Sequence, residues 1–131
     1  MGNNTGAAYI YERNTNGTWT QYSTVLTASD GVTANDRFGF TVSIFGDYAI
    51  VGAYGEDTTA SDSGAAYIFE RDANGSWSQT QMLKASNAGN ADYFGRSVSI
   101  SGDYAIVGAF NEDTMGNNTG CLLYTSDAAD E

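Results

Sequence analysis

Residues 38–53 read FGFTVSIFGDYAIVGA and residues 94–109 read FGRSVSISGDYAIVGA, so one 16-residue unit recurs at an offset of 56 residues. A fixed period of this size indicates repeated supersecondary units, each of which buries one face against its neighbours. The chain is therefore expected to fold as an array of such units rather than around one central core.

Each unit contains two extended segments joined by a turn. Apolar and polar side chains alternate over residues 40–45, which is typical of a strand with one wet face. Residues 48–53 are apolar almost throughout, which indicates a strand that is buried on both faces. The pair Gly46-Asp47 favours a type II′ hairpin, because glycine accepts the positive φ of the first turn position. The residues expected to be most buried include Ile50, Val51, Ile106 and Val107.

Two further strands are predicted in the repeat, at residues 64–71 (GAAYIFER) and 77–84 (WSQTQMLK). Asn-Gly pairs follow the first of these and its earlier copy, which predicts type I′ turns at Asn16-Gly17 and Asn74-Gly75. Four antiparallel strands in about 56 residues, at 40–45, 47–53, 64–71 and 77–84, are typical of a propeller blade. An earlier pair of strands is predicted at residues 6–13 and 18–26.

Three side-chain features of the repeat carry expectations about packing. The glycines of Phe-Gly and Gly-Ala are expected to permit close backbone contact rather than to do chemistry. Trp19 and Trp77 open the outer strands, where packing between blades is favoured over stacking on carbohydrate. Apolar surface is expected to remain uncovered on the two end blades, at Tyr9, Tyr11, Val98 and Ile100.

The repeat resembles the FG-GAP repeat of integrin-like β-propellers, and more closely its bacterial relatives. The resemblance rests on the opening Phe-Gly, the Gly-Asp turn, the apolar run ending in Gly-Ala and the GAAYIFER strand. Tyr54 and Phe110 stand where the family has a proline, and the chain contains no proline. Over roughly residues 1 to 120, the resemblance implies an all-β fold of antiparallel four-stranded β-propeller blades. It also implies an extracellular or cell-surface protein that takes part in cell adhesion.

The repeats divide the chain into four predicted parts. Residues 1–28 form the second half of a blade, residues 29–86 a linker and a full blade, and residues 87–120 the first half of the next blade with its loop. Two blade equivalents cannot close a ring, because propellers typically have four to eight blades. We therefore expect an incomplete fragment whose partners include the neighbouring blades of the missing chain.

Residues 121–131 form the fourth part, which is predicted to be a non-native tail. The sequence leaves the repeat after Gly120 and resembles a translated sequencing adapter. We expect low order or opportunistic pairing there, with Leu122, Leu123 and Tyr124 able to pair with the strand edge left vacant after Ala109.

Charge and composition narrow the possible functions. The formal net charge of −11 disfavours nucleic acid and anionic membranes as partners. Membrane insertion is not expected, because no apolar run approaches the roughly 20 residues that span a bilayer. The chain has no histidine, which removes imidazole bases and the commonest transition-metal ligand. A carbohydrate-active enzyme would need two carboxylates facing one cleft, and no such pair can be identified from the sequence.

Calcium is the one cofactor that remains a candidate. Calcium-binding integrin blades carry an Asp-rich turn, whereas this chain has only Asp47 and Asp103 at the corresponding turns, too few oxygens for the ion. The polar loops offer separate candidate ligands, with solvated surface acids as the alternative interpretation. The candidate ligands are Glu56, Asp57 and Asp62 in the first loop and Glu112, Asp113 and Asn118 in the second.

The sequence therefore predicts a non-catalytic, extracellular module of the binding or adhesion type. Its ligand would be a protein or a glycan held by loops at the rim of the propeller, where recognition residues commonly sit. Two alternatives remain open: a calcium-stabilised integrin-like propeller, and part of a carbohydrate-active propeller enzyme.

Overall fold

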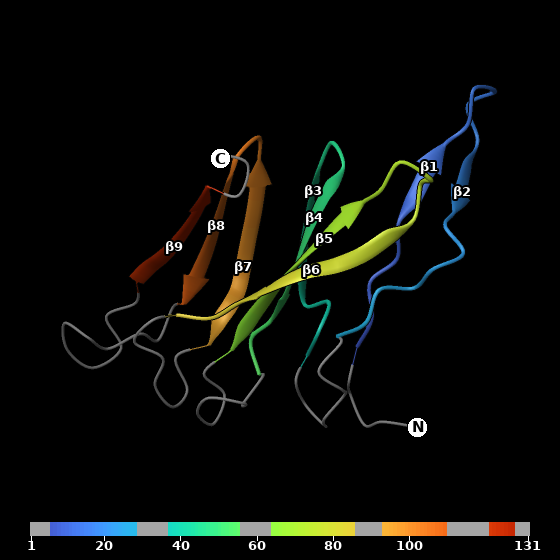
Figure 1. Ribbon diagram of the computed structural model, residues 1–131. Helices are drawn as coiled ribbons and strands as arrows, with labels where there is room; N and C mark the ends of the chain where they lie inside the picture. Colours follow the sequence, from blue (N-terminus) through green and yellow to red (C-terminus); the bar gives the residue numbers. More distant parts are fainter. Residues whose placement is uncertain (1–5, 29–36, 56–63, 86–92, 110–120, 128–131) are drawn as a thin grey trace.

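The protein is all-β, with three antiparallel sheets standing one after another along the chain (Figure 1). The computed structural model describes residues 6–28, 37–55, 64–85, 93–109 and 121–127. The first sheet pairs β1 (Tyr11–Arg13) with β2 (Trp19–Gln21). The second contains β3 (Thr41–Phe45), β4 (Tyr48–Ala53), β5 (Ala65–Arg71) and β6 (Trp77–Leu83). The third contains β7 (Phe94–Ser101), β8 (Tyr104–Ala109) and β9 (Cys121–Asp127).

The four-stranded sheet is the blade that the repeat predicts. Its strands pair in chain order, β3-β4-β5-β6, and every neighbouring pair is antiparallel. The observed strand bounds differ from the predicted ones by one residue at most. In the first sheet the strands are shorter than predicted, and single bridges join Ala8 to Leu26 and Gly6 to Phe38 outside the ladder.

The hairpin turns confirm one prediction and correct another. Gly46 has a φ of 58° and Asp47 has no positive φ, as the type II′ turn requires. The type I′ prediction at Asn16-Gly17 is wrong, because only Gly17 has a positive φ, at 91°. Gly17 N donates to Asn14 O at 2.9 Å, so the loop is a three-residue connection that ends in a left-handed glycine. The loop before Ser76 repeats this geometry, with Gly75 N donating to Asp72 O at 2.9 Å.

Alternation along β4 buries this strand on both faces. Ala49 and Val51 share a cluster with Ala8, Ile10 and other residues that face the first sheet. Ile50 points the other way and shares a second cluster with residues of the third sheet. Burial of Ile50, Val51 and Val107 is therefore as predicted.

The burial predicted for Ile106 is wrong, since 39% of this residue is exposed. Ile106 occupies in β8 the position that Ile50 occupies in β4, but it faces away from the second sheet. Among the described residues, no further sheet stacks on that face.

The predicted uncovered surface is correct at one end and wrong at the other. Tyr9 and Tyr11 are 57% and 54% exposed, as expected. Val98 and Ile100 are half-buried, because β7 packs its apolar side chains against the second sheet. Uncovered apolar side chains lie instead on β3, at Val42 and Ile44, and on β8, at Tyr104 and Ile106.

Glycine permits the close approach of neighbouring sheets, as predicted. Gly64 forms a parallel bridge with Phe94, and Gly95 of the same Phe-Gly pair has a φ of 96°. A Cβ atom on Gly95 would overlap the carbonyl oxygen of Ala65 in the neighbouring sheet. Larger residues at this junction would separate the two backbones.

The last strand, β9, pairs with the edge of β8. Its first two pairs, Ala109 with Cys121 and Gly108 with Leu122, repeat the register in which β5 starts on β4. The register then shifts between Val107 and Gly108, whereas the β4–β5 ladder continues without a shift. Pairing along the vacant edge was the arrangement expected for residues 122–124.

Candidate functional site

The calcium candidates of both polar loops lie outside the described residues. Glu56, Asp57 and Asp62 belong to the segment 56–63, and Glu112, Asp113 and Asn118 belong to the segment 110–120. Within the part of the chain that the structure describes, no three His, Cys, Asp or Glu side chains gather as metal ligands do. The two loop sites remain predictions. A melting temperature that rises with calcium over EDTA, and no longer rises in Asp57→Asn, would support the first of them.

The carboxylate of the Gly-Asp turn has a structural role. Asp47 accepts hydrogen bonds from Arg71 Nε at 3.0 Å and Arg71 Nη2 at 2.8 Å, which ties the β3–β4 turn to the end of β5. The hydrogen bonds from Arg71 and the charge of Asp47 raise the pKa of the guanidinium. Both side chains are partly exposed, so this ion pair contributes little to stability.

The strongest candidate binding surface lies at the end of the sheets that is opposite to the β3–β4 turn. The hairpin turns after β3, β5 and β7 lie at one end of the sheets, and β3 and β7 begin at the other (Figure 1). At this second end, three aromatic rings and two guanidinium groups are in contact. We call this set the rim cluster: Arg37, Phe40, Tyr54, Tyr93 and Arg96.

The rings of the rim cluster meet edge to face. The ring of Tyr54 lies 4.7 Å from that of Phe40 and 5.5 Å from that of Tyr93, at interplanar angles of 70° and 77°. The guanidinium carbon of Arg96 lies 4.9 Å from the centre of the Phe40 ring and 5.0 Å from that of Tyr54. Arg37 approaches Tyr54 at 5.5 Å. Cation–π contacts of this kind at exposed sites contribute about 0.5–1 kcal/mol each.

The same turn occurs twice and positions most of the rim cluster. Phe40 N donates to Arg37 O at 3.1 Å, and Arg96 N donates to Tyr93 O at 3.1 Å. Arg37 and Tyr93 both adopt a positive φ, near 60°, which is uncommon outside glycine. Each turn thus brings residues 37 and 40, or 93 and 96, to the end of its own sheet. Stacking of the sheets then places the arginine of one turn against the aromatic ring of the other.

The rim cluster concentrates positive charge on an acidic protein. The chain has only five lysines and arginines against 16 acids, and two of the five belong to this cluster. Phe40 is 49% exposed, and a shallow hollow of about 280 Å³ opens beside it, lined also by Arg37, Gly39 and others. Guanidinium groups bind carboxylates through paired hydrogen bonds. The cluster is therefore suited to a ligand that combines a flat apolar face with an acidic group.

Sequence reasoning missed the rim cluster, although a signal for it was present. The turn positions 37 and 93 hold Arg and Tyr, and positions 40 and 96 hold Phe and Arg, while the strands around them are nearly identical. Substitutions between arginine and aromatic residues at matching positions of a repeat point to a surface role rather than to core packing.

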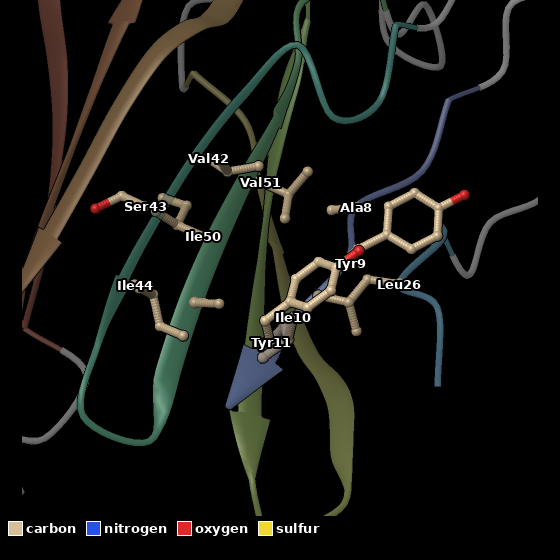
Figure 2. A pocket seen from close by; sticks show the side chains of 11 residues that line it. Ala8, Tyr9, Ile10, Tyr11, Leu26, Val42, Ser43, Ile44, Ile50 and Val51 are labelled. Carbon is tan, nitrogen blue, oxygen red and sulfur yellow. The ribbon is translucent and has the colours of Figure 1, made fainter. Parts of the chain in front are cut away.

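A second hollow is an apolar groove between the first and second sheets. It encloses about 250 Å³ and is lined by side chains of both sheets, among them Tyr9 and Tyr11 on one side and Val42 and Ile44 on the other (Figure 2). Among the described residues that line it, Ser43 alone is neither apolar nor aromatic. The groove offers packing area but little hydrogen bonding.

The two tryptophans, Trp19 and Trp77, differ in burial. Trp77 is buried and meets Tyr22 edge to face at 6.4 Å, as expected for packing between blades. Trp19 is 64% exposed, so the packing predicted for it is wrong. Its outer face would be covered only by a sheet ahead of β1, and the described residues contain none.

Comparison with known proteins identifies the family of the repeat. The family model described as FG-GAP repeat matches residues 19–69 and 77–122. No curated protein shows significant similarity to this chain. Among the described residues there is no helix of the length and hydropathy that a membrane span requires.

Proposed function

This chain belongs to the FG-GAP repeat family, and on this premise we propose that it is a non-catalytic binding module of an extracellular or cell-surface protein. The ligand is a protein or a glycan, and binding serves adhesion. The observation that supports the proposal is the rim cluster, which gathers aromatic and guanidinium groups at the end of the sheets where β3 and β7 begin.

The position of the rim cluster and the chemistry of its side chains both favour a role in ligand binding. Rigid scaffolds commonly carry their binding residues where loops emerge, and the rim cluster lies there. Tyrosine and arginine are among the residues that dominate binding energy at interfaces, because each combines a large contact area with directed hydrogen bonds. A role in binding rather than catalysis also fits the chemistry, because guanidinium groups stay protonated in proteins and are poor general bases.

The charge of the chain narrows the ligand to one with a local acidic group. A uniformly acidic partner would be repelled by a net charge of −11. A ligand that presents one carboxylate beside an apolar face would meet Arg37 and Arg96 before it meets the acidic remainder. Acidic oligosaccharides and short acidic peptides both satisfy this description.

Binding to an array of acidic and neutral oligosaccharides and acidic peptides tests the proposal, with product release scored in parallel. For a retained ligand, we expect Arg96→Ala to weaken affinity by about tenfold to a hundredfold, the range for one lost charged hydrogen bond. Tyr54→Ala should weaken it as well. Arg71→Ala is the matched control, since Arg71 ends β5 beside the β3–β4 turn, away from the rim cluster, and its exposed ion pair with Asp47 contributes little to stability.

Two results would contradict the proposal. Equal losses in Arg96→Ala and Arg71→Ala would indicate a general charge effect rather than a site. Turnover of any retained glycan would show that the module is not purely a binder.

A further inference from the structure

The interface between the second and third sheets shows how two blades of this protein join. Ile50 on β4 is fully buried in a cluster that also receives Val98 and Ile100 from β7. Ile100 N donates to Ser43 Oγ at 3.2 Å across the same interface. The side of β4 that carries Ile50 is thus complementary to the side of β7 that carries Val98 and Ile100.

The same two surfaces occur a second time, uncovered. Tyr104 and Ile106 are the repeat counterparts of Tyr48 and Ile50, and they are 62% and 39% exposed. Val42 and Ile44 are the counterparts of Val98 and Ile100, and they are 60% and 55% exposed. We call the first pair the trailing face and the second pair the leading face. Each exposed face matches a partner that the molecule itself presents at its other end.

The strand edges match in the same way. In the second sheet, β5 pairs with β4 through six consecutive residues. Residues 9–13, which end in β1, read YIYER and are nearly identical to YIFER at residues 67–71 of β5. Among the described residues, β1 pairs only with β2 and has an open second edge. The groove of Figure 2 lies between the side chains of this segment and those of β3.

We propose that a second copy of this chain docks head to tail, so that β7 and β8 of one copy and β1 and β2 of the next form one four-stranded blade. The trailing face of the first copy then packs on the leading face of the second. The strand β9 holds the edge that β1 of the second copy needs, in a register that shifts after two pairs, and it is displaced on docking.

The repeat assigns the register of the new ladder. By analogy with β4 and β5, Val107 pairs with Tyr9 and Ala105 with Tyr11 of the second copy. Asp103 then meets Arg13 as Asp47 meets Arg71 within the chain. A heterologous contact of this kind forms a ring when its rotation closes. Each copy supplies two blade equivalents, so a ring of four to eight blades needs about two to four copies.

The assembly is tested by the mass of the full chain in solution, measured by light scattering or sedimentation over a range of concentrations. We expect multiples of the 13.9 kDa chain to form as concentration rises. Tyr124→Pro should shift this transition to lower concentration, because proline weakens the hold of β9 on β8. Val42→Glu and Ile106→Glu should each keep the protein at the mass of one chain.

A mixture of the last two variants distinguishes head-to-tail docking from other association. Each variant keeps one intact face, so the mixture should form a species of two chains and nothing larger. Phe45→Glu is the matched control: Phe45 is an exposed apolar residue of β3 whose counterpart, Ser101, stays exposed in the packed pair of sheets. This variant should assemble like the parent.

Three results would overturn the proposal: a folded Tyr124→Pro chain that stays monomeric, a Val42→Glu chain that still assembles, or a mixture that does not pair. Circular dichroism verifies folding. If Tyr124→Pro unfolds, hydrogen exchange of the parent protein tests the proposal instead. Docking should slow exchange of the β1 amides as the protein concentration rises. Exchange that does not change with concentration would refute head-to-tail docking.

Discussion

Replacing Gly95 by alanine tests the claim that glycine sets the distance between neighbouring sheets. Gly95 has a φ of 96°, and an added Cβ would overlap the carbonyl oxygen of Ala65. Ala65 is held in the β4–β5 ladder, and Gly95 lies in β7 between the paired residues Phe94 and Ser97, so relief requires movement of the backbone in one of the two sheets. The matched control is Gly75→Ala, because Gly75 has a similar φ of 83° but open space around its Cβ.

Gly95→Ala and Gly75→Ala should both lower the free energy of unfolding through backbone strain, and Gly95→Ala should lower it further through overpacking. A non-glycine residue in the left-handed region costs about 1–2 kcal/mol, and this applies to both. Overpacking adds about 1–3 kcal/mol, occasionally more, and applies only to Gly95. The total for Gly95→Ala is therefore about 2–5 kcal/mol, a large share of the roughly 5–15 kcal/mol that stabilises a typical small domain.

Thermal and denaturant unfolding of the two variants measures this difference. At about 4 °C per kcal/mol for a chain of this size, Gly95→Ala should melt about 4–12 °C below Gly75→Ala. Equal losses in the two variants would refute the reasoning, because backbone strain alone would then explain both. Loss of the third sheet with retention of the second in hydrogen exchange would locate the damage at the junction.

Three further predictions concern the core, an ionisable side chain and a surface ion pair. Ile50→Ala should cost about 2–5 kcal/mol in unfolding free energy, because Ile50 is fully buried, whereas Ile106→Ala at the matching repeat position should cost far less when measured in dilute solution; similar losses would show that both faces are covered. The charge of Glu70, followed by burial and a hydrogen bond that the Tyr48 hydroxyl donates to the Glu70 carboxylate, raises the pKa of Tyr48 above 10.0, so the folded state holds this proton more tightly than the unfolded state. The stability that the Tyr48 hydroxyl contributes is complete below about pH 10 and is lost as pH rises through the higher pKa of the folded state. The denaturation midpoint should therefore fall at alkaline pH, and Tyr48→Phe should remove the part of this fall that comes from Tyr48. Asp47→Asn should lower stability only slightly and the difference should shrink with added salt, because Arg71 and Asp47 are partly exposed; a large, salt-independent loss would contradict this account.

Local patterns were sufficient to predict the blade. The positions of β3 to β6, their antiparallel order and the type II′ turn at Gly46 follow from alternation, from turn chemistry and from a repeat that shows each element twice. These features depend on neighbours along the chain, which the sequence displays directly. The Asn-Gly turn was mistaken because its type depends on loop length, and Gly17 closes a loop of three residues rather than two.

The candidate site was far less predictable. Arg37 and Tyr54 lie 17 residues apart and meet at the end of the second sheet. Arg96 lies 42 residues beyond Tyr54, and only the stacking of the third sheet on the second brings it to them. The sequence instead predicts calcium sites in the two acidic loops, because carboxylates can be identified as metal ligands from the sequence alone. Contacts between rings and guanidinium groups have no such local signature.

The sequence by itself determined that the chain is an array of antiparallel blades, because each repeat states its own strands and turns. Only the tertiary structure decided which copy of each apolar face is covered. Ile50 and Ile106 stand in the same local sequence, DYAIVGA, yet one is fully buried and the other is 39% exposed. Burial of a blade face depends on the sheet stacked against it, and that neighbour lies outside the local sequence that the two residues share.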